Sequence, residues 1–192
     1  MSHRGRVLLR DFTANAFDGQ VVGVVGAAGT DVDVVLLALA GRFGPVAGSV
    51  SIQGAPESVS LGGVPDEEHL DPLLTVHETL AEVSRPSADG STRQSADWSL
   101  MATGLTGRVD ARIRDLSVEE RFRLAIAMGA ASGASLIVTD LSRVAGHNAS
   151  GELWVLLRQL AASGRVVVVA APERHESMHL VIPVPAPVEA AR

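Results

Sequence analysis

Residues 21–41 read VVGVVGAAGTDVDVVLLALAG, in which an apolar run passes through a glycine-containing loop into a second apolar segment. The run Gln20–Val25 is almost entirely apolar, as a buried central strand requires. The segment Asp33–Ala40 has the apolar spacing of a helix, with Gly41 at the stop position. A strand, a glycine loop and a helix in this order form the arrangement in which backbone N–H groups and the positive helix end receive a phosphate. The stretch therefore predicts an α/β protein with an anion-binding turn.

The rest of the chain alternates short β-like runs with helical patterns, which favours a mainly parallel, buried sheet. Further strands are predicted at Ser49–Gln53, Ser135–Asp140 and Arg165–Ala171. Further helices are predicted at Thr75–Val83, Val118–Ala131 and Glu152–Ala162. The polar, turn-rich stretch Ser84–Asp97 has no period, and we interpret it as a mobile surface loop.

Composition limits the class of protein. The 192 residues, 46% of them apolar, fit one domain, and the formal charge of −6 argues against nucleic-acid binding. Cysteine is absent, and all 16 basic side chains are arginine, so no mechanism can use a lysine ammonium group. The chain has neither the apolar core of a signal peptide near its start nor the run of about 20 apolar residues that spans a bilayer. We expect a soluble cytoplasmic protein without direct membrane insertion.

The order and spacing of these segments resemble the nucleotide-binding domain of ABC transporters, the ATP-binding cassette, over nearly the whole chain. The likeness is carried by the following segments: Gly26–Asp33, Leu39-Ala40-Gly41, Gly48–Gly54, Gly62–Pro65, Leu74–Glu78, Leu116-Ser117 and the strand that ends at Asp140. The resemblance implies a P-loop NTPase-like fold with a mainly parallel sheet core, an antiparallel β subdomain and a small helical subdomain. Residues 1–192 would form a single cassette, residues 67–115 its helical subdomain, and residues 185–192 a disordered tail.

The family's phosphate loop, G-x-x-x-x-G-K-[ST], falls on residues 26–33 with Gly26 as its first glycine. The intervening residues include Gly29 and Thr30, and the last three positions hold Asp31 for glycine, Val32 for lysine and Asp33 for the magnesium-binding hydroxyl. At about 4 Å, each like-charge contact costs roughly 1 kcal/mol in water-like surroundings and about 4 kcal/mol at an effective dielectric of about 20. We therefore predict that Mg-ATP does not bind tightly, and that Asp31 or Asp33 instead caps the helix.

Other positions to which the resemblance assigns chemistry are also altered. Asp140 matches the aspartate that holds magnesium, whereas the catalytic glutamate position is Leu141, the glutamine position is Asp66 and the switch histidine position is Pro172. The signature sequence L-S-G-G-Q falls on Leu116 and the residues Ser117, Val118, Glu119 and Glu120. Ser117-x-x-Glu120 and Thr75-x-x-Glu78 are both capping boxes, which predict a helix start without any ligand.

Rival interpretations rest on smaller patterns. His175, Glu176 and His179 match H-E-x-x-H, the zinc hydrolase motif, but we favour a chance match on a solvated surface helix and expect no metal there. Asp33 and Asp140 form a weak candidate for a cation site. The two tryptophans, Trp98 and Trp154, are interpreted as packing residues, and the basic cluster is interpreted as a solvated face; it contains Arg112, Arg114, Arg121 and Arg123.

The sequence thus predicts a degenerate ABC cassette that does not hydrolyse ATP. By resemblance it would be an accessory or regulatory subunit, bound to a membrane permease or to an intact cassette ATPase at the inner face of the plasma membrane. No cofactor is expected. The alternative is a divergent active ATPase that uses ATP and Mg²⁺, and a zinc hydrolase is a minor alternative. The identity of the partner, the transported substrate and dimer formation stay open.

Overall fold

The computed structural model describes residues 2–3, 6–7, 13–26, 30–42, 59–62, 70–84, 91–144 and 151–185. The predicted strand Ser49–Gln53, the glutamine position Asp66, Gly29 and the predicted tail beyond residue 185 lie outside the described residues.

The core is a five-stranded sheet in the order β4-β5-β6-β3-β7, and every pair of neighbouring strands is parallel. The strands have the following bounds: β3 is Val21–Val25, β4 is Val59–Gly62, β5 is Leu136–Asp140, β6 is Val166–Ala171 and β7 is Leu180–Pro183. The prediction of a parallel buried sheet is confirmed, and β3, β5 and β6 lie within one residue of their predicted bounds. The short strands β4 and β7 were not predicted. A separate antiparallel pair joins β1, Ser2–His3, to β2, Arg6–Val7.

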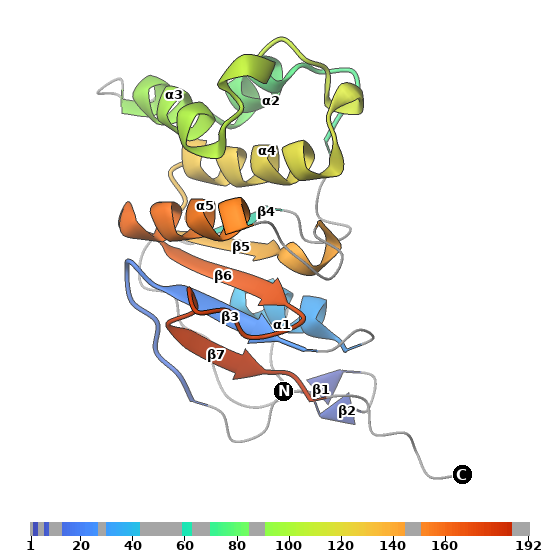
Figure 1. The fold of residues 1–192 in the computed structure, drawn as a ribbon, viewed down its shortest axis with the longest axis vertical. Helices are drawn as coiled ribbons and strands as arrows, with labels where there is room; N and C mark the ends of the chain where they lie inside the picture. The colour runs from blue at the N-terminus through green and yellow to red at the C-terminus, as the bar shows by residue number, and fades with distance from the viewer. Residues whose placement is uncertain are drawn as a thin grey trace.

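Helices cover both faces of the sheet (Figure 1). Helix α1, Val32–Leu39, packs on one face against a cluster that includes Val22, Val24 and Val168. Helices α4, Val118–Ala131, and α5, Gly151–Ala162, belong to the cluster on the opposite face. Successive residues of β3 alternate between the two clusters, as the pleat of a buried strand demands. The result is a three-layer α/β/α core.

Helix α4 approaches β4 closely because small residues meet there. A Cβ atom built on Gly129 would lie 2.6 Å from Ser60 Oγ, and one on Gly62 would lie 3.0 Å from the carbonyl oxygen of Ala125. The missing side chains allow the helix to pack close to the edge of the sheet.

A helical layer packs on the outer side of α4, at the end of the molecule opposite β7 (Figure 1). It contains α2, Val76–Val83, α3, Ser91–Thr103, and two 3₁₀ turns, η2, Thr106–Arg108, and η3, Ile113–Asp115. These elements surround an apolar cluster built around the fully buried Leu105 and Leu124. They fall within the interval 67–115 that the resemblance assigns to a helical subdomain.

The prediction of a loop over Ser84–Asp97 was wrong from Ser91 onward, where α3 begins. This segment is polar and weakly amphipathic, but it buries Ser99, Leu100 and Thr103 and packs on α4. Tertiary contacts therefore stabilise a helix that local propensity does not indicate. Within the described part of the chain, no helix is both long enough and apolar enough to span a bilayer.

Candidate functional site

The carboxyl ends of β3, β5 and β6 meet at one edge of the sheet, the position at which open parallel sheets bind ligands. Val25 is in register with Ala171, and Asp140 is in register with Ala170. The residues that follow these strands, Gly26, Leu141 and Pro172, are therefore brought to the same edge.

The loop after β3 starts at Gly26, whose N–H donates to the carbonyl oxygen of Ala171 at 3.3 Å. A Cβ atom on Gly26 would collide with the hydroxyl of Thr30 and would lie 2.7 Å from Cγ1 of Val32. Val32 is half-buried and packs against the cluster under α1. The residue at the lysine position is thus a packing residue.

The start of α1 differs from the prediction of an aspartate cap. Asp31 occupies the N-cap position, but its side chain makes no capping hydrogen bond to the helix. Of the two residues predicted to cap the helix, Asp31 or Asp33, Asp31 is therefore ruled out as the source of a side-chain capping bond. Asp33 lies in the first turn, as expected, where a carboxylate interacts favourably with the helix dipole.

The end of β5 contains the positions of the magnesium-binding aspartate and of the catalytic glutamate. Asp140 is only 3% exposed, and its Oδ1 accepts hydrogen bonds from the backbone N–H of Ser142 at 2.9 Å and from the Ser142 hydroxyl at 2.6 Å. It thereby caps the 3₁₀ turn η4, Leu141–Arg143. Leu141 is 1% exposed and belongs to the apolar cluster between the sheet and α5. The residue at the catalytic glutamate position is thus part of the core.

The connection from β6 to β7 contains both the switch position and the H-E-x-x-H match. Pro172 lies exposed in a bend. Residues 172–179 form turns, so the helix that would bring the two imidazoles onto one face does not form. Instead, the His175 ring stacks on Trp154 with centroids 4.1 Å apart and its Nδ1 accepts from Ser177 N–H, while His179 Nδ1 accepts from Val21 N–H at 3.0 Å.

These contacts correct the expectation of a solvated surface helix and leave the zinc hydrolase alternative without the geometry it needs. The described residues contain no group of three or more His, Cys, Asp or Glu side chains that could hold a metal ion. The weaker idea of a cation between Asp33 and Asp140 stays a prediction.

The signature position at the start of α4 is occupied by a complete capping box, as predicted. Ser117 Oγ accepts from the backbone N–H of Glu120 at 3.1 Å, and Glu120 Oε2 accepts from the backbone N–H of Ser117 at 2.8 Å. The pKa of Glu120 lies below its usual value, chiefly because the backbone N–H of Ser117 donates to its carboxylate. The Ser117 side chain and the nearby Arg108 guanidinium lower this pKa further. Val118 stands 54% exposed beside them.

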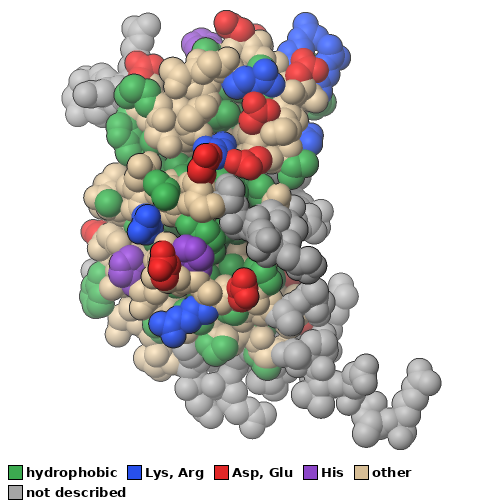
Figure 2. All heavy atoms as spheres, in the orientation of Figure 1, with side chains coloured by type: hydrophobic (Ala, Val, Ile, Leu, Met, Phe, Trp, Pro, Cys, Tyr) green, Lys and Arg blue, Asp and Glu red, His purple; other side chains and the backbone are tan. Residues whose placement is uncertain are grey.

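The basic cluster near the signature position is only partly the solvated face that we predicted. Arg112, Arg114 and Arg121 are exposed, whereas the Arg123 side chain is 16% exposed and forms ion pairs with Glu119 and Glu152. The spacing of Glu119 and Arg123, four residues apart on a helix, signals the first pair. On the face drawn in Figure 2, basic and acidic side chains are interspersed.

The roles of the tryptophans are confirmed, and an unpredicted arginine joins one of them. Trp154 is 6% exposed in the core, and Trp98 is partly buried against the same cluster. The Arg165 guanidinium lies over the Trp98 ring, 5.4 Å from its centroid, and its Nε donates to the carbonyl oxygen of Ala134 at 3.1 Å. Burial lowers the pKa of Arg165.

Comparison with known proteins places this geometry in a family. The sequence profile of the ABC transporter family matches residues 9–141. An ABC transporter ATP-binding protein of Streptomyces avermitilis is 32% identical over 178 residues, covering 87% of this chain and 31% of the relative. The Nod factor export ATP-binding protein I of Cupriavidus pinatubonensis is 27% identical over 184 residues, covering 91% of this chain and 57% of the relative. The chain thus spans between about a third and somewhat more than half of the length of these relatives.

Solved structures share the fold. An ABC transporter ATP-binding protein from Pyrococcus furiosus superposes with a TM-score of 0.74 at 15% identity, covering 95% of this chain and 92% of that one. The cbiO1 protein of Clostridium perfringens, part of the ABC transporter complex cbiONQ, gives a TM-score of 0.70 at 18% identity, covering 86% and 72%. The sheet order, the helical layer and the family match agree: this chain belongs to the ABC transporter family as an ATP-binding cassette.

Proposed function

We propose that this cassette does not hydrolyse ATP and acts through protein contacts, as an accessory or regulatory subunit of an ABC transporter. It would be cytoplasmic and bound at the inner face of the membrane to a permease or to an intact cassette ATPase.

The burial of Leu141 carries the proposal. In an active cassette this position holds the glutamate that polarises the attacking water, so it must reach the edge of the sheet. Here the side chain is 1% exposed within the core cluster, on the side of the sheet that α5 covers. A leucine has no acceptor for a proton, and a side chain in this position is unavailable to a water molecule at the edge.

The loop after β3 supports the same conclusion electrostatically. Val32 contributes packing in place of a cation, and Asp31 and Asp33 add negative charge at the start of α1. A bound triphosphate would face repulsion of roughly 1–4 kcal/mol from each carboxylate at about 4 Å. A micromolar site has only about 8 kcal/mol of binding free energy in total. The residues present therefore do not fit the phosphates of Mg-ATP in the usual pose.

The capping box at the start of α4 is a third support. Ser117 and Glu120 already satisfy each other's backbone N–H groups. The carboxylate of Glu120 also pairs with Arg108 Nε at 2.9 Å. Two backbone N–H groups at the start of α4 are thus satisfied without a phosphate.

Calorimetry tests the first half of the proposal. Titration of the chain with Mg-ATP is expected to give no saturable binding tighter than about 1 µM, and phosphate release is expected to match that of the Asp140→Asn variant. Tight binding would contradict the absence of an Mg-ATP site, and turnover that Asp140→Asn abolishes would instead establish the divergent active ATPase, for which the retained Asp140 is the specific argument.

Complex formation tests the second half. The chain is co-expressed with candidate ABC permeases and, separately, with candidate intact cassette ATPases, and it is purified in detergent with and without Mg-ATP. The proposal expects a complex with one of these partner classes that forms equally well in both conditions. Failure to form a complex with either class, or formation only with Mg-ATP, contradicts the accessory role.

A further inference from the structure

The two histidines of the H-E-x-x-H match use the same ring atom in the same way. His179 Nδ1 accepts from the N–H of Val21 at 3.0 Å, and His175 Nδ1 accepts from the N–H of Ser177 at 3.2 Å. A ring nitrogen that accepts a hydrogen bond carries no proton, so both imidazoles are neutral in this arrangement. The loop between β6 and β7 is therefore built around two neutral rings.

His179 takes the place of a strand residue beside the start of β3. Its backbone N–H donates to the carbonyl oxygen of Val21 at 2.8 Å, and its ring accepts from the N–H of the same residue. Strand β7 begins one residue later, at Leu180, in register with Val22. Because Val21 is 0% exposed, its N–H would have no acceptor without the ring, and a buried unpaired donor is costly.

Protonation would affect the two rings differently. The His175 ring is stacked on Trp154, so a positive charge there would gain a cation–π interaction while it loses the bond to Ser177. His179 has no such compensation, and its side chain is exposed. Its ring can turn into solvent when it gains a proton, while the neighbouring Met178 stays buried against the sheet. The bond to Val21 is thus the contact that depends most directly on a proton.

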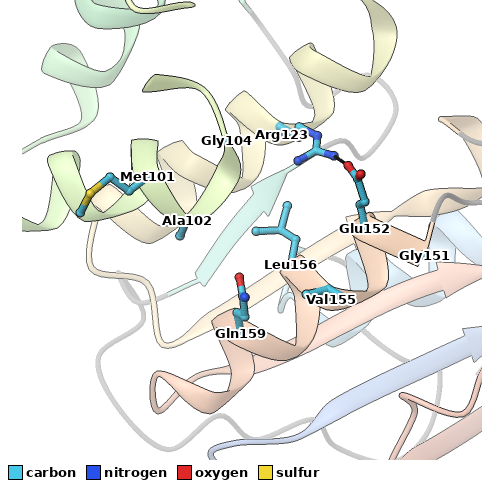
Figure 3. A pocket seen from close by; sticks show the side chains of 9 residues that line it. All are labelled: Met101, Ala102, Gly104, Arg123, Gly151, Glu152, Val155, Leu156 and Gln159. Atoms are coloured by element: carbon cyan, nitrogen blue, oxygen red, sulfur yellow. Dashed lines mark hydrogen bonds and ion pairs between the residues drawn. The ribbon is translucent and has the colours of Figure 1, made fainter. Parts of the chain in front are cut away.

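The charged groups around this loop do not bond to either ring. Strands β3 and β7 contain no ionisable side chain, and neither imidazole forms an ion pair with any residue that the structure describes. On α5, Glu152 lines the hollow toward α3 and pairs with Arg123, on a different face of the helix from Trp154 (Figure 3). The other charged side chains of the loop and of the elements beside it are the exposed Glu173, Arg174 and Glu176 of the loop, Asp18 before β3 and Arg158 of α5, and the half-buried Arg165 at the start of β6.

We propose that His179 is a proton-sensitive clasp between β3 and β7: its neutral ring pairs the buried Val21 N–H, and a proton on Nδ1 breaks this bond and turns the ring into solvent. An imidazole ordinarily changes its charge between about pH 5 and pH 8. The unfolded chain takes up this proton freely, whereas the clasp excludes it from Nδ1. The stabilisation is therefore complete at the upper end of this range and is lost as the pH falls through it. The clasp is independent of the proposed function, because it involves neither a nucleotide nor a partner.

Nuclear magnetic resonance of the full chain tests the clasp. The Val21 amide reports the bond directly, and the ring nitrogen shifts of His179 report which nitrogen carries the proton. Between about pH 8 and pH 5, the exchange protection of the Val21 amide, corrected for the intrinsic pH dependence of exchange, should fall roughly tenfold. His179→Asn keeps an acceptor that does not titrate, so its protection should change by less than about twofold. His77→Asn removes an exposed histidine of α2 and is the matched control, which should respond as the unmodified chain does.

A second variant covers the case in which His179→Asn does not fold. His179→Ala removes the acceptor at every pH, so the Val21 amide should be poorly protected at the upper end of the range and should change little below it. A histidine that served the fold without gaining a proton would leave the unmodified chain with no pH response at Val21, and that result would overturn the proposal. A response that persists in His179→Asn or His179→Ala, a response that His77→Asn also abolishes, or a proton on Nδ1 of His179 at the upper end of the range would overturn it as well.

Discussion

The carboxyl edge of the sheet and the start of α4 are stabilised in different ways. At the edge, Leu141 is buried in the core and Val32 packs under α1, so positions that carry chemistry in other cassettes here contribute apolar contact. At the start of α4, by contrast, the prominent contacts are hydrogen bonds and ion pairs close to solvent: the box of Ser117 and Glu120, and the ion pairs of Arg123 with Glu119 and Glu152.

The difference has a physical consequence that mutation can expose. Apolar packing responds strongly to changes in volume and to buried charge, and only weakly to pH or salt. Exposed hydrogen-bonded and ionic contacts contribute little each, but they respond to pH and ionic strength. The edge should therefore give large effects when volume or buried charge is changed, and the start of α4 should give small effects that depend on pH.

The largest effect is expected at Leu141. Leu141→Glu restores the residue type found in active cassettes but places a carboxylate in an apolar cluster, and it should lower the free energy of unfolding by at least about 3 kcal/mol. Denaturant titration measures the loss. Leu141→Met, which conserves volume, should cost less than about 1.5 kcal/mol. A stable Leu141→Glu variant that gains ATP hydrolysis would mean that the edge is not part of the core.

The next largest loss of stability is expected at Gly23 of β3, which lies against Met178 in the loop between β6 and β7. A Cβ atom on Gly23 would collide with the sulfur of Met178 and would lie 2.8 Å from its Cε, and Met178 is only 5% exposed. Gly23→Ala should therefore destabilise the protein by roughly 1–3 kcal/mol in thermal unfolding. The double variant with Met178→Ala should lose less than the sum of the two single variants, because the collision is removed. Additive losses would contradict the contact.

A smaller effect is expected at the start of α4. Ser117→Ala removes the acceptor of the Glu120 N–H and should cost about 1 kcal/mol in denaturant unfolding. Ser117→Asn retains a capping acceptor and should remain within a few tenths of a kcal/mol of the unmodified protein. Equal losses in the two variants would show that the hydroxyl serves something other than the cap.

The local part of this comparison is visible in the sequence. Both capping boxes, Thr75 with Glu78 and Ser117 with Glu120, join residues three apart, so the pattern alone predicts them. The strands β3, β5 and β6 are also predicted by local pattern, because a short run that is almost entirely apolar is typical of a strand buried on both faces of a parallel sheet. Helix α3 was missed because its residues carry no clear apolar period and are held by packing on α4.

The contacts that distinguish the site are long-range and could not be predicted in this way. Arg123 and Glu152 are 29 residues apart, and His179 is 158 residues from the Val21 N–H that it binds. The motif positions correctly indicate that Leu141 replaces a glutamate, but its burial depends on where α5 packs. The histidines at 175 and 179 show the converse, since a local pattern suggests a metal site and the fold uses both rings for structure.

The smallest effect separates the two regions by pH. Glu120 and Glu78 each have a pKa below the ordinary value of 4.5 in the folded protein, chiefly because a backbone N–H of the capping box donates to the carboxylate. A lowered folded-state pKa means that the carboxylate form stabilises the fold: the contribution is complete above about pH 4.5 and is lost as the pH falls through the lowered value. Glu120→Gln keeps a hydrogen-bonding side chain without the charge. Its melting temperature should lie slightly below that of the unmodified protein at neutral pH and converge with it in acid, whereas the difference caused by Leu141→Met should not change with pH. If the difference in melting temperature between Glu120→Gln and the unmodified protein stayed the same in strong acid, the charge of Glu120 would not contribute to the cap. Its stabilising effect would then come from the hydrogen bonds alone.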